Sequence, residues 1–200
     1  MSDAATARGR SMLVPRPRQA SMLGTGMMIW LASELMFLAA LYAAYLTIRA
    51  HDNSGVWPPA GDKVDVALIG VLTAVLVASA LTMRRGVALH ASGRRAAAGW
   101  WVAASFVGGL AFVAAQAAEW ASAPFSASTN AYGSMFYLIT GVDVAHAVIG
   151  LVALALLGAA MAGQAGSLSL REHSIFQAIG YYWSFVAGIC VVSYILLYLL

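Results

Sequence analysis

Four ionisable side chains fall inside, or at the edge of, otherwise apolar stretches of this sequence. Glu34 lies near the middle of TGMMIWLASELMFLAALYAAYL, Glu119 ends a later stretch, and Asp143 and His146 lie three residues apart in another. A charge at the centre of a bilayer costs ~2.5–3.5 kcal/mol on insertion scales, so each group should face protein, find a partner or be neutral. Their chemistry is therefore either proton handling or hydrogen bonding between helices.

The spacing of Asp143 and His146 places both on one face of a helix, where the carboxylate could accept a hydrogen bond from the imidazole. Such a pair could relay protons, or it could be a self-contained structural pair. For Glu34 the alternatives are a proton-handling role and a neutral carboxylic acid bonded to a neighbouring helix. Glu119, beside Trp120 at a helix end, is the easiest to hydrate, and a cap at the membrane interface is its simplest role.

The composition assigns these residues to an integral membrane protein. Of the 200 residues, 62% are hydrophobic and 10% are charged, and the mean hydropathy is +0.80, unlike a soluble domain. Five apolar stretches each reach the ~20 residues that a helix needs to span hydrocarbon, and none alternates as a barrel strand would. We predict an all-α bundle of five transmembrane helices in one domain, residues 21–200, after a basic tail at 1–20, with helices at about 22–49, 64–85, 97–119, 131–163 and 172–199.

Basic residues predict the orientation of this bundle. Nine of the eleven Lys and Arg residues fall on one side of the expected topology, and only Lys63 and Arg49 fall on the other. By the positive-inside rule the N-terminus is cytoplasmic, and five crossings place the C-terminus on the outer side. The net charge of +3 follows from this topology, and no nucleic-acid partner is inferred from it. The nine basic residues predicted on the cytoplasmic side are the four arginines of the tail, Arg84, Arg85, Arg94 and Arg95 around the loop between helices two and three, and Arg171.

The chain lacks the residues for a redox metal centre of its own. Of the four histidines, His146 alone is predicted deep inside a span. We assign His51 and His90 to loops and His173 to the start of the last helix. Two axial haem ligands or a three-histidine copper site cannot be built from this set. Cys190 is the single cysteine, which excludes an internal disulfide. We therefore predict that this chain binds no metal.

Several segments together resemble one protein family, cytochrome c oxidase subunit III of the haem–copper oxidases. They are WLASELMFLAALYAAYL, GVWPP, AQAAEWASAPFSASTNAYGSMFYLITG, and His173 with Phe176 and YYWSFV, in the family's order over roughly residues 22–200. The resemblance implies the five-helix form that lacks the first two helices of longer relatives. Glu34 matches the family's intramembrane glutamate, and the matched structural positions are Trp57, Pro58, Tyr132, Gly133, Thr140, Gly141 and Trp183.

Two motifs depart from the family pattern. TGVDVAH has Asp143 where T-G-x-H-G-x-H has its first histidine, and WSFVA has Ser184 and Ala187 where W-H-F-V-D has a histidine and an aspartate. The exchanged groups belong to the fourth and fifth helices, so a shared polar network has been altered. This leaves the type of oxidase open and motivates an alternative, an accessory subunit of a nitric oxide reductase.

The resemblance implies a non-catalytic subunit of a respiratory terminal oxidase in a bacterial plasma membrane. Haem and copper would reside in subunits I and II, with this chain packed on subunit I, supporting proton uptake and protecting the oxygen-reducing complex. Phospholipid would occupy a V-shaped cleft between the first two shared helices and the rest, with Glu34, Arg171 and His173 as lipid contacts. A cytochrome bc complex and cytochrome c would be further partners in a supercomplex.

A different class of function is an independent proton or small-solute transporter. It would use Glu34 together with Asp143 and His146. The sequence shows no internal repeat, and inverted repeats and broken helices are typical of many transporter folds, which disfavours this alternative.

Overall fold

The computed structural model describes residues 22–52, 57–59, 65–163 and 169–200, without the side chains of 169–172. These residues form five α-helices and a final π-helical turn, and no strand occurs among them. Each of the five helices is long and apolar enough to cross a membrane, which confirms the predicted all-α architecture. The elements are α1 (Met22–Ala50), α2 (Val66–Ala91), α3 (Arg95–Ser122), α4 (Ala131–Ala162), α5 (Ser169–Tyr194) and η1 (Ile195–Leu199).

Two helices begin at side-chain caps that the sequence supplies locally. Asp65 accepts a hydrogen bond from the backbone N–H of Leu68 at the start of α2. The carboxamide oxygen of Asn130 accepts one from the N–H of Gly133 at 2.7 Å, at the start of α4. Each cap satisfies one of the N–H groups that lack a partner in the first helical turn. Both caps are local, because each polar side chain bonds an N–H group three residues later.

The second helix is longer than expected. It ends at Ala91 rather than near residue 85, and residues 92–94 alone separate it from α3. Arg84, Arg85 and His90 therefore lie within α2, so the assignment of His90 to a loop was wrong. A helix of 26 residues is about 39 Å long and extends beyond a hydrocarbon core of ~30 Å. The exposed Arg84 and Arg85 led us to end the predicted helix near residue 85, but α2 continues past them for six more residues.

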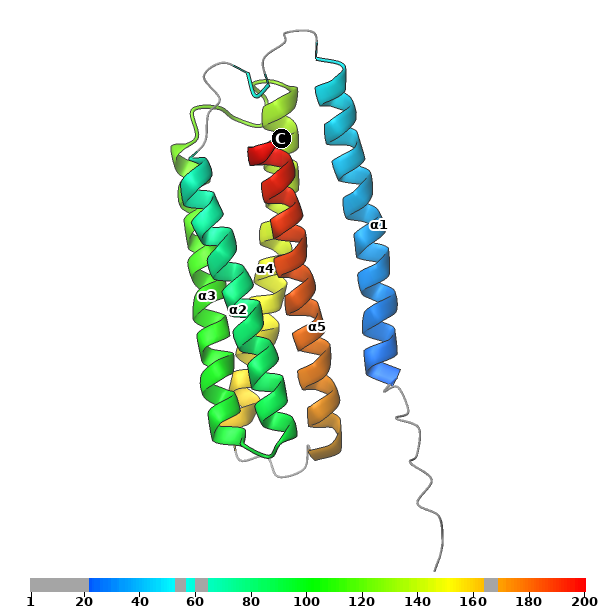
Figure 1. Cartoon of the computed structure of the whole chain (residues 1–200), viewed down its shortest axis with the longest axis vertical. Helices are drawn as coiled ribbons and strands as arrows, with labels where there is room; N and C mark the ends of the chain where they lie inside the picture. Colours follow the sequence, from blue (N-terminus) through cyan, green and yellow to red (C-terminus); the bar gives the residue numbers. More distant parts are fainter. Residues whose placement is uncertain (1–21, 53–56, 60–64, 164–168) are drawn as a thin grey trace, which may run out of the picture.

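Four of the helices form the bundle and α1 lies at its edge, as Figure 1 shows. Helix α2 packs on α3 and α5, and α4 packs on α3 and α5, whereas α1 contacts α5 and α4. The implied grouping of the first two helices against the rest is therefore not formed, because α2 belongs to the bundle. The buried residues of α1 are Leu31, Leu38 and Tyr45, one side chain every seven residues.

The centre of the bundle is organised around Trp183 of α5, which is fully buried. Its indole ring lies against Gly109 of α3 and Gly150 of α4, and its Nε1–H donates to Ser79 Oγ of α2 at 2.9 Å. Ser79 and Ser105 also exchange hydrogen bonds between α2 and α3, each hydroxyl donating to the other's carbonyl at 2.7 and 2.8 Å. Small residues permit this close approach, as they do in membrane bundles generally.

An aromatic cluster closes the end of the bundle where α1 ends and α4 begins. The indole N–H of Trp57 donates to the Tyr45 hydroxyl at 2.9 Å, and the same indole meets Tyr132 edge-on, with ring centroids 5.5 Å apart. Phe125 and Phe136 pack beside Tyr132. This cluster joins the first connecting segment to α1 and α4. It gives Trp57 and Tyr132, both singled out by the sequence, a structural role.

Candidate functional site

A polar pair lies between α1 and α4, near the middle of these two membrane-spanning helices. His146 Nε2 is 3.3 Å from Glu34 Oε2, and the two residues fall near the middle of their helices. His146 Nδ1 is 2.8 Å from the carbonyl oxygen of Val142. A carbonyl only accepts, so this geometry assigns an N–H to Nδ1. Nε2 can then accept a hydrogen bond from a protonated Glu34 carboxyl group or, when it carries a proton itself, donate one to the Glu34 carboxylate.

Aromatic side chains fix the position of this pair. Tyr182 of α5 donates its hydroxyl hydrogen to the backbone oxygen of His146 at 2.9 Å. Its ring stacks on Trp30 of α1, with centroids 5.4 Å apart and planes within 4°. Glu34 keeps 25% of its side-chain surface exposed, against 10% for His146. The Glu34 end of the pair, on α1, is therefore the more accessible from outside the bundle.

Asp143 belongs to a second and more deeply buried group. Its carboxyl group lies near Ser193 of α5, whose hydroxyl is 2.8 Å from the Tyr42 hydroxyl of α1. The carboxyl oxygen Oδ1 of Asp143 is buried without a hydrogen-bond partner among the described residues. The hydrogen bond predicted between Asp143 and His146 is not formed, because the imidazole nitrogens of His146 contact Val142 and Glu34. The reason is that α1 places Glu34 opposite the imidazole, while α5 places Ser193 opposite the carboxyl group.

Together these groups could hold a proton within the membrane. Glu34 and His146 can exist as a neutral pair or as an ion pair, and the two states differ only in which atom holds the shared proton. Asp143 lies close enough to His146 to interact with it electrostatically. A carboxyl group, an imidazole and a second carboxyl group thus lie in sequence from the α1 face toward the centre of the bundle.

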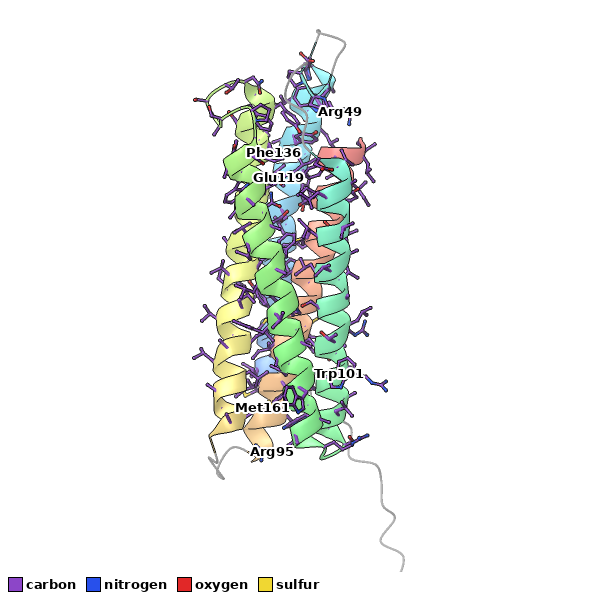
Figure 2. The ribbon with its side chains drawn as sticks, turned by 90° about the vertical axis from the view of Figure 1, so that its left-hand side faces the viewer. Arg49, Arg95, Trp101, Glu119, Phe136 and Met161 are labelled. Carbon is purple, nitrogen blue, oxygen red and sulfur yellow. The ribbon has the colours of Figure 1, made fainter. Side chains whose placement is uncertain are left out.

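Glu119 lies in a separate polar group near the opposite end of α3 from Arg95, as Figure 2 shows. Its carboxyl group accepts hydrogen bonds from the Gln116 amide, one turn earlier, and from the Tyr198 hydroxyl at 3.1 and 3.2 Å. The residue is 7% exposed. Glu119 therefore joins α3 to η1 from inside the protein, so the expectation of a well-hydrated cap was wrong. Trp120 instead donates to Thr140 of α4 at 3.1 Å.

Other residues singled out from the sequence contact neighbouring side chains or their own helix. His173 stacks with His90, and His90 stacks on Phe176 with ring centroids 4.1 Å apart. Ser184 donates to Gly180 of its own helix. Within the described ranges, no group of three or more His, Cys, Asp or Glu side chains could hold a metal ion. The side chain of Arg171 lies outside the described part of the chain.

Four partners in these sites escaped the sequence reasoning: Gln116, Tyr198, Tyr42 and Ser193. The spacing of Gln116 and Glu119, three residues apart on one helix, could have indicated the first contact. Tyr42 and Ser193 are 151 residues apart, and Tyr198 is 79 residues from Glu119. Nothing local in the sequence signals such pairs.

Comparison with known proteins identifies the family. A family profile described as Cytochrome c oxidase subunit III matches residues 16–200. The chain is 36% identical over 169 residues to a probable cytochrome c oxidase subunit 3 of Nocardia farcinica, covering 83% of this chain and 82% of the relative. It is 34% identical to that of Mycobacterium tuberculosis, covering 89% and 88%. It is 29% identical to cytochrome c oxidase subunit 3 of Thermostichus vulcanus, covering 88% and 86%. The chain therefore belongs to the cytochrome c oxidase subunit III family, a family of accessory oxidase subunits, and does so as a multi-pass membrane protein.

Proposed function

We propose that this chain is the non-catalytic accessory subunit of a respiratory haem–copper terminal oxidase in a bacterial plasma membrane. The observation that carries the proposal is the family match over residues 16–200. The donor inventory supports it, because haem and copper would need ligands that the chain supplies too sparsely. Oxygen chemistry, haem and copper would then belong to subunits I and II, with this chain packed on subunit I. A cytochrome bc complex with cytochrome c is a further proposed partner.

The arginine distribution supports a cytoplasmic N-terminal side. Arg84, Arg85, Arg94 and Arg95 lie toward the end where α2 meets α3, and Arg49 lies at the opposite end, where Figure 2 labels it. In bacterial membranes the end richer in Lys and Arg faces the cytoplasm. The end with Trp57 and Glu119 would then face outward.

Within the complex, we assign the Glu34 and His146 pair to the support of proton uptake. Glu34 is partly exposed at mid-depth, where a titratable group on the face of α1 can exchange a proton with a neighbouring subunit. Glu34 and His173, together with Arg171, are also the proposed phospholipid contacts. Asp143 occupies the position of a histidine in the family motif. The polar side chains around it fit a structural role between α1, α4 and α5.

The function is tested by purifying the native assembly. A tag on the N-terminus, extraction from native membranes in mild detergent, a visible absorption spectrum and mass spectrometry of all co-purifying chains give the answer together. We expect haem bands, oxidase subunits I and II, and oxygen consumption. Nitric oxide reduction with non-haem iron would instead support the reductase alternative, which the departures at Asp143 and Ser184 motivate. A colourless solitary protein that transports protons in liposomes would overturn both.

The role of Glu34 is tested by comparing two substitutions in the purified complex. Glu34→Gln keeps a donor for His146 Nε2 but cannot bind or release a proton, so we expect slower proton uptake with little loss of stability. Glu34→Ala also removes the hydrogen bond, at a cost of about 1 kcal/mol. Ser33→Ala is the matched control, because the Ser33 hydroxyl bonds only to its own helix at Trp30.

The readouts for these variants are proton uptake by the complex in vesicles and the number of turnovers before inactivation. Wild-type values for Glu34→Gln, together with weakened α1 packing in Glu34→Ala, would show that Glu34 is purely structural.

A further inference from the structure

A long apolar groove runs between α3 and α4, away from the polar groups described above. Its volume is about 750 Å³, within the ~300–1,000 Å³ of small-molecule sites. The buried side chains of Val102 and Leu154 line it, together with the exposed Trp100 and Val107. A Cβ atom added at Gly158 would meet no atom within 4 Å. The groove is therefore open at Gly158, with the bundle core beside it.

The groove has the length of one membrane leaflet. Along α3 it extends from Arg95 to Val107, which is about 18 Å at 1.5 Å per residue. Half of a bilayer of ~40–45 Å, headgroups included, is ~20–22 Å. The groove occupies the first half of α3 and the last part of α4. It thus runs from one membrane surface toward the midplane and ends there.

Positive charge lies at the surface end of this groove. Arg95 lines it, and Arg94, Arg85 and Arg84 are exposed toward the same end of the bundle. Trp100 and Trp101 follow one turn further in, at the level expected for interfacial tryptophans. Figure 2 shows Arg95 and Met161 at this end. A group with a negative headgroup and an apolar tail would match both the charge and the lining.

The geometry points to a binding site for an anionic phospholipid, with one acyl chain in the α3–α4 groove and its phosphate near Arg95. A transmembrane helix is ~10–12 Å wide with its side chains and would rest on the rims, whereas an acyl chain is narrow enough to reach Val102 and Leu154. When the acyl chain of a lipid lies in the groove, its phosphate lies at the level of the arginines. This site is on other helices than the lipid contacts proposed above and does not depend on them.

The site is tested by groove-filling and charge-removing variants. The tagged chain, with whichever subunits accompany it, is placed in nanodiscs of equimolar phosphatidylglycerol and phosphatidylcholine and then re-extracted in mild detergent. Retained lipid is quantified by mass spectrometry. Gly158→Leu fills the groove from α4, and Ala103→Leu fills it from α3 should the first variant fold poorly. Gly188→Leu on α5 is the matched control, since a Cβ there also meets nothing within 4 Å.

We expect the wild type to retain phosphatidylglycerol about fivefold over phosphatidylcholine, the preference that one basic side chain near a membrane surface provides. Arg95→Gln should retain lipid without that preference. Gly158→Leu and Ala103→Leu should lose the retained lipid, whereas Gly188→Leu should behave as the wild type. Unchanged retention in folded groove-filled variants, or a density map with a helix of another subunit or a second copy in the groove, would overturn the proposal.

Discussion

The Gly150→Val variant is expected to destabilise the subunit by about 3 kcal/mol, at the upper end of what overpacking a core costs. The indole ring of Trp183 lies directly over Gly150, so that even one Cβ there would overlap the ring atoms. Trp183 cannot move away freely, because Gly109 lies against the same indole. Its hydrogen bond to Ser79 would be strained or lost, and that bond contributes about 1 kcal/mol. The contacts of α5 with α3 and with α4, which share the Trp183 indole, should therefore be lost at the same time.

The measurement is the thermal unfolding midpoint of the purified assembly, together with the amount of this subunit retained per complex after gel filtration. Gly188→Val is the matched control, because a Cβ at Gly188 meets open space on α5. We expect the control to keep its midpoint and its stoichiometry. Equal midpoints for Gly150→Val and Gly188→Val would show that Trp183 does not organise the bundle.

The Glu119→Ala variant is expected to cost about 2–3 kcal/mol. It leaves the Gln116 amide and the Tyr198 hydroxyl without their shared acceptor, and each buried unsatisfied donor costs about 1–3 kcal/mol. Glu119 also borders a pocket of about 170 Å³ lined by Asp65, Ser122 and Pro124. Water entering that pocket would replace part of what is lost, which keeps the expected cost below the sum of two full penalties.

Glu119→Gln is the matched comparison for this second prediction. Its amide keeps one oxygen for Tyr198, and Gln116 can turn its own amide to accept from the new NH₂ group, so we expect a loss of about 1 kcal/mol. Hydrogen exchange at η1 and the end of α3, measured in the intact assembly, reports the local effect. If Glu119→Ala leaves exchange in both segments unchanged, Tyr198 and Glu119 do not stabilise this end.

The sequence by itself determined the architecture of the described chain. Length and hydropathy decide how many segments can span a bilayer, because a helix is the structure that satisfies its own backbone hydrogen bonds in hydrocarbon. The caps at Asp65 and Asn130 are likewise local, since each bonds an N–H group three residues later. The retained motifs were specific enough to indicate the family, and Glu34 and His146 stood out because ionisable groups are costly in lipid.

Only the tertiary structure decided which of these residues meet. His146 lies beside Glu34, 112 residues away, rather than bonded to Asp143 within its own helix. The end of α2 and the position of His90 beside Phe176 also depended on packing. In lipid the outer face of a helix is as apolar as its buried face, so hydropathy cannot tell the face of α1 that carries Leu38 from the faces turned to the membrane. Polar pairing across helices is set by how the faces dock, and that is a property of the assembled bundle.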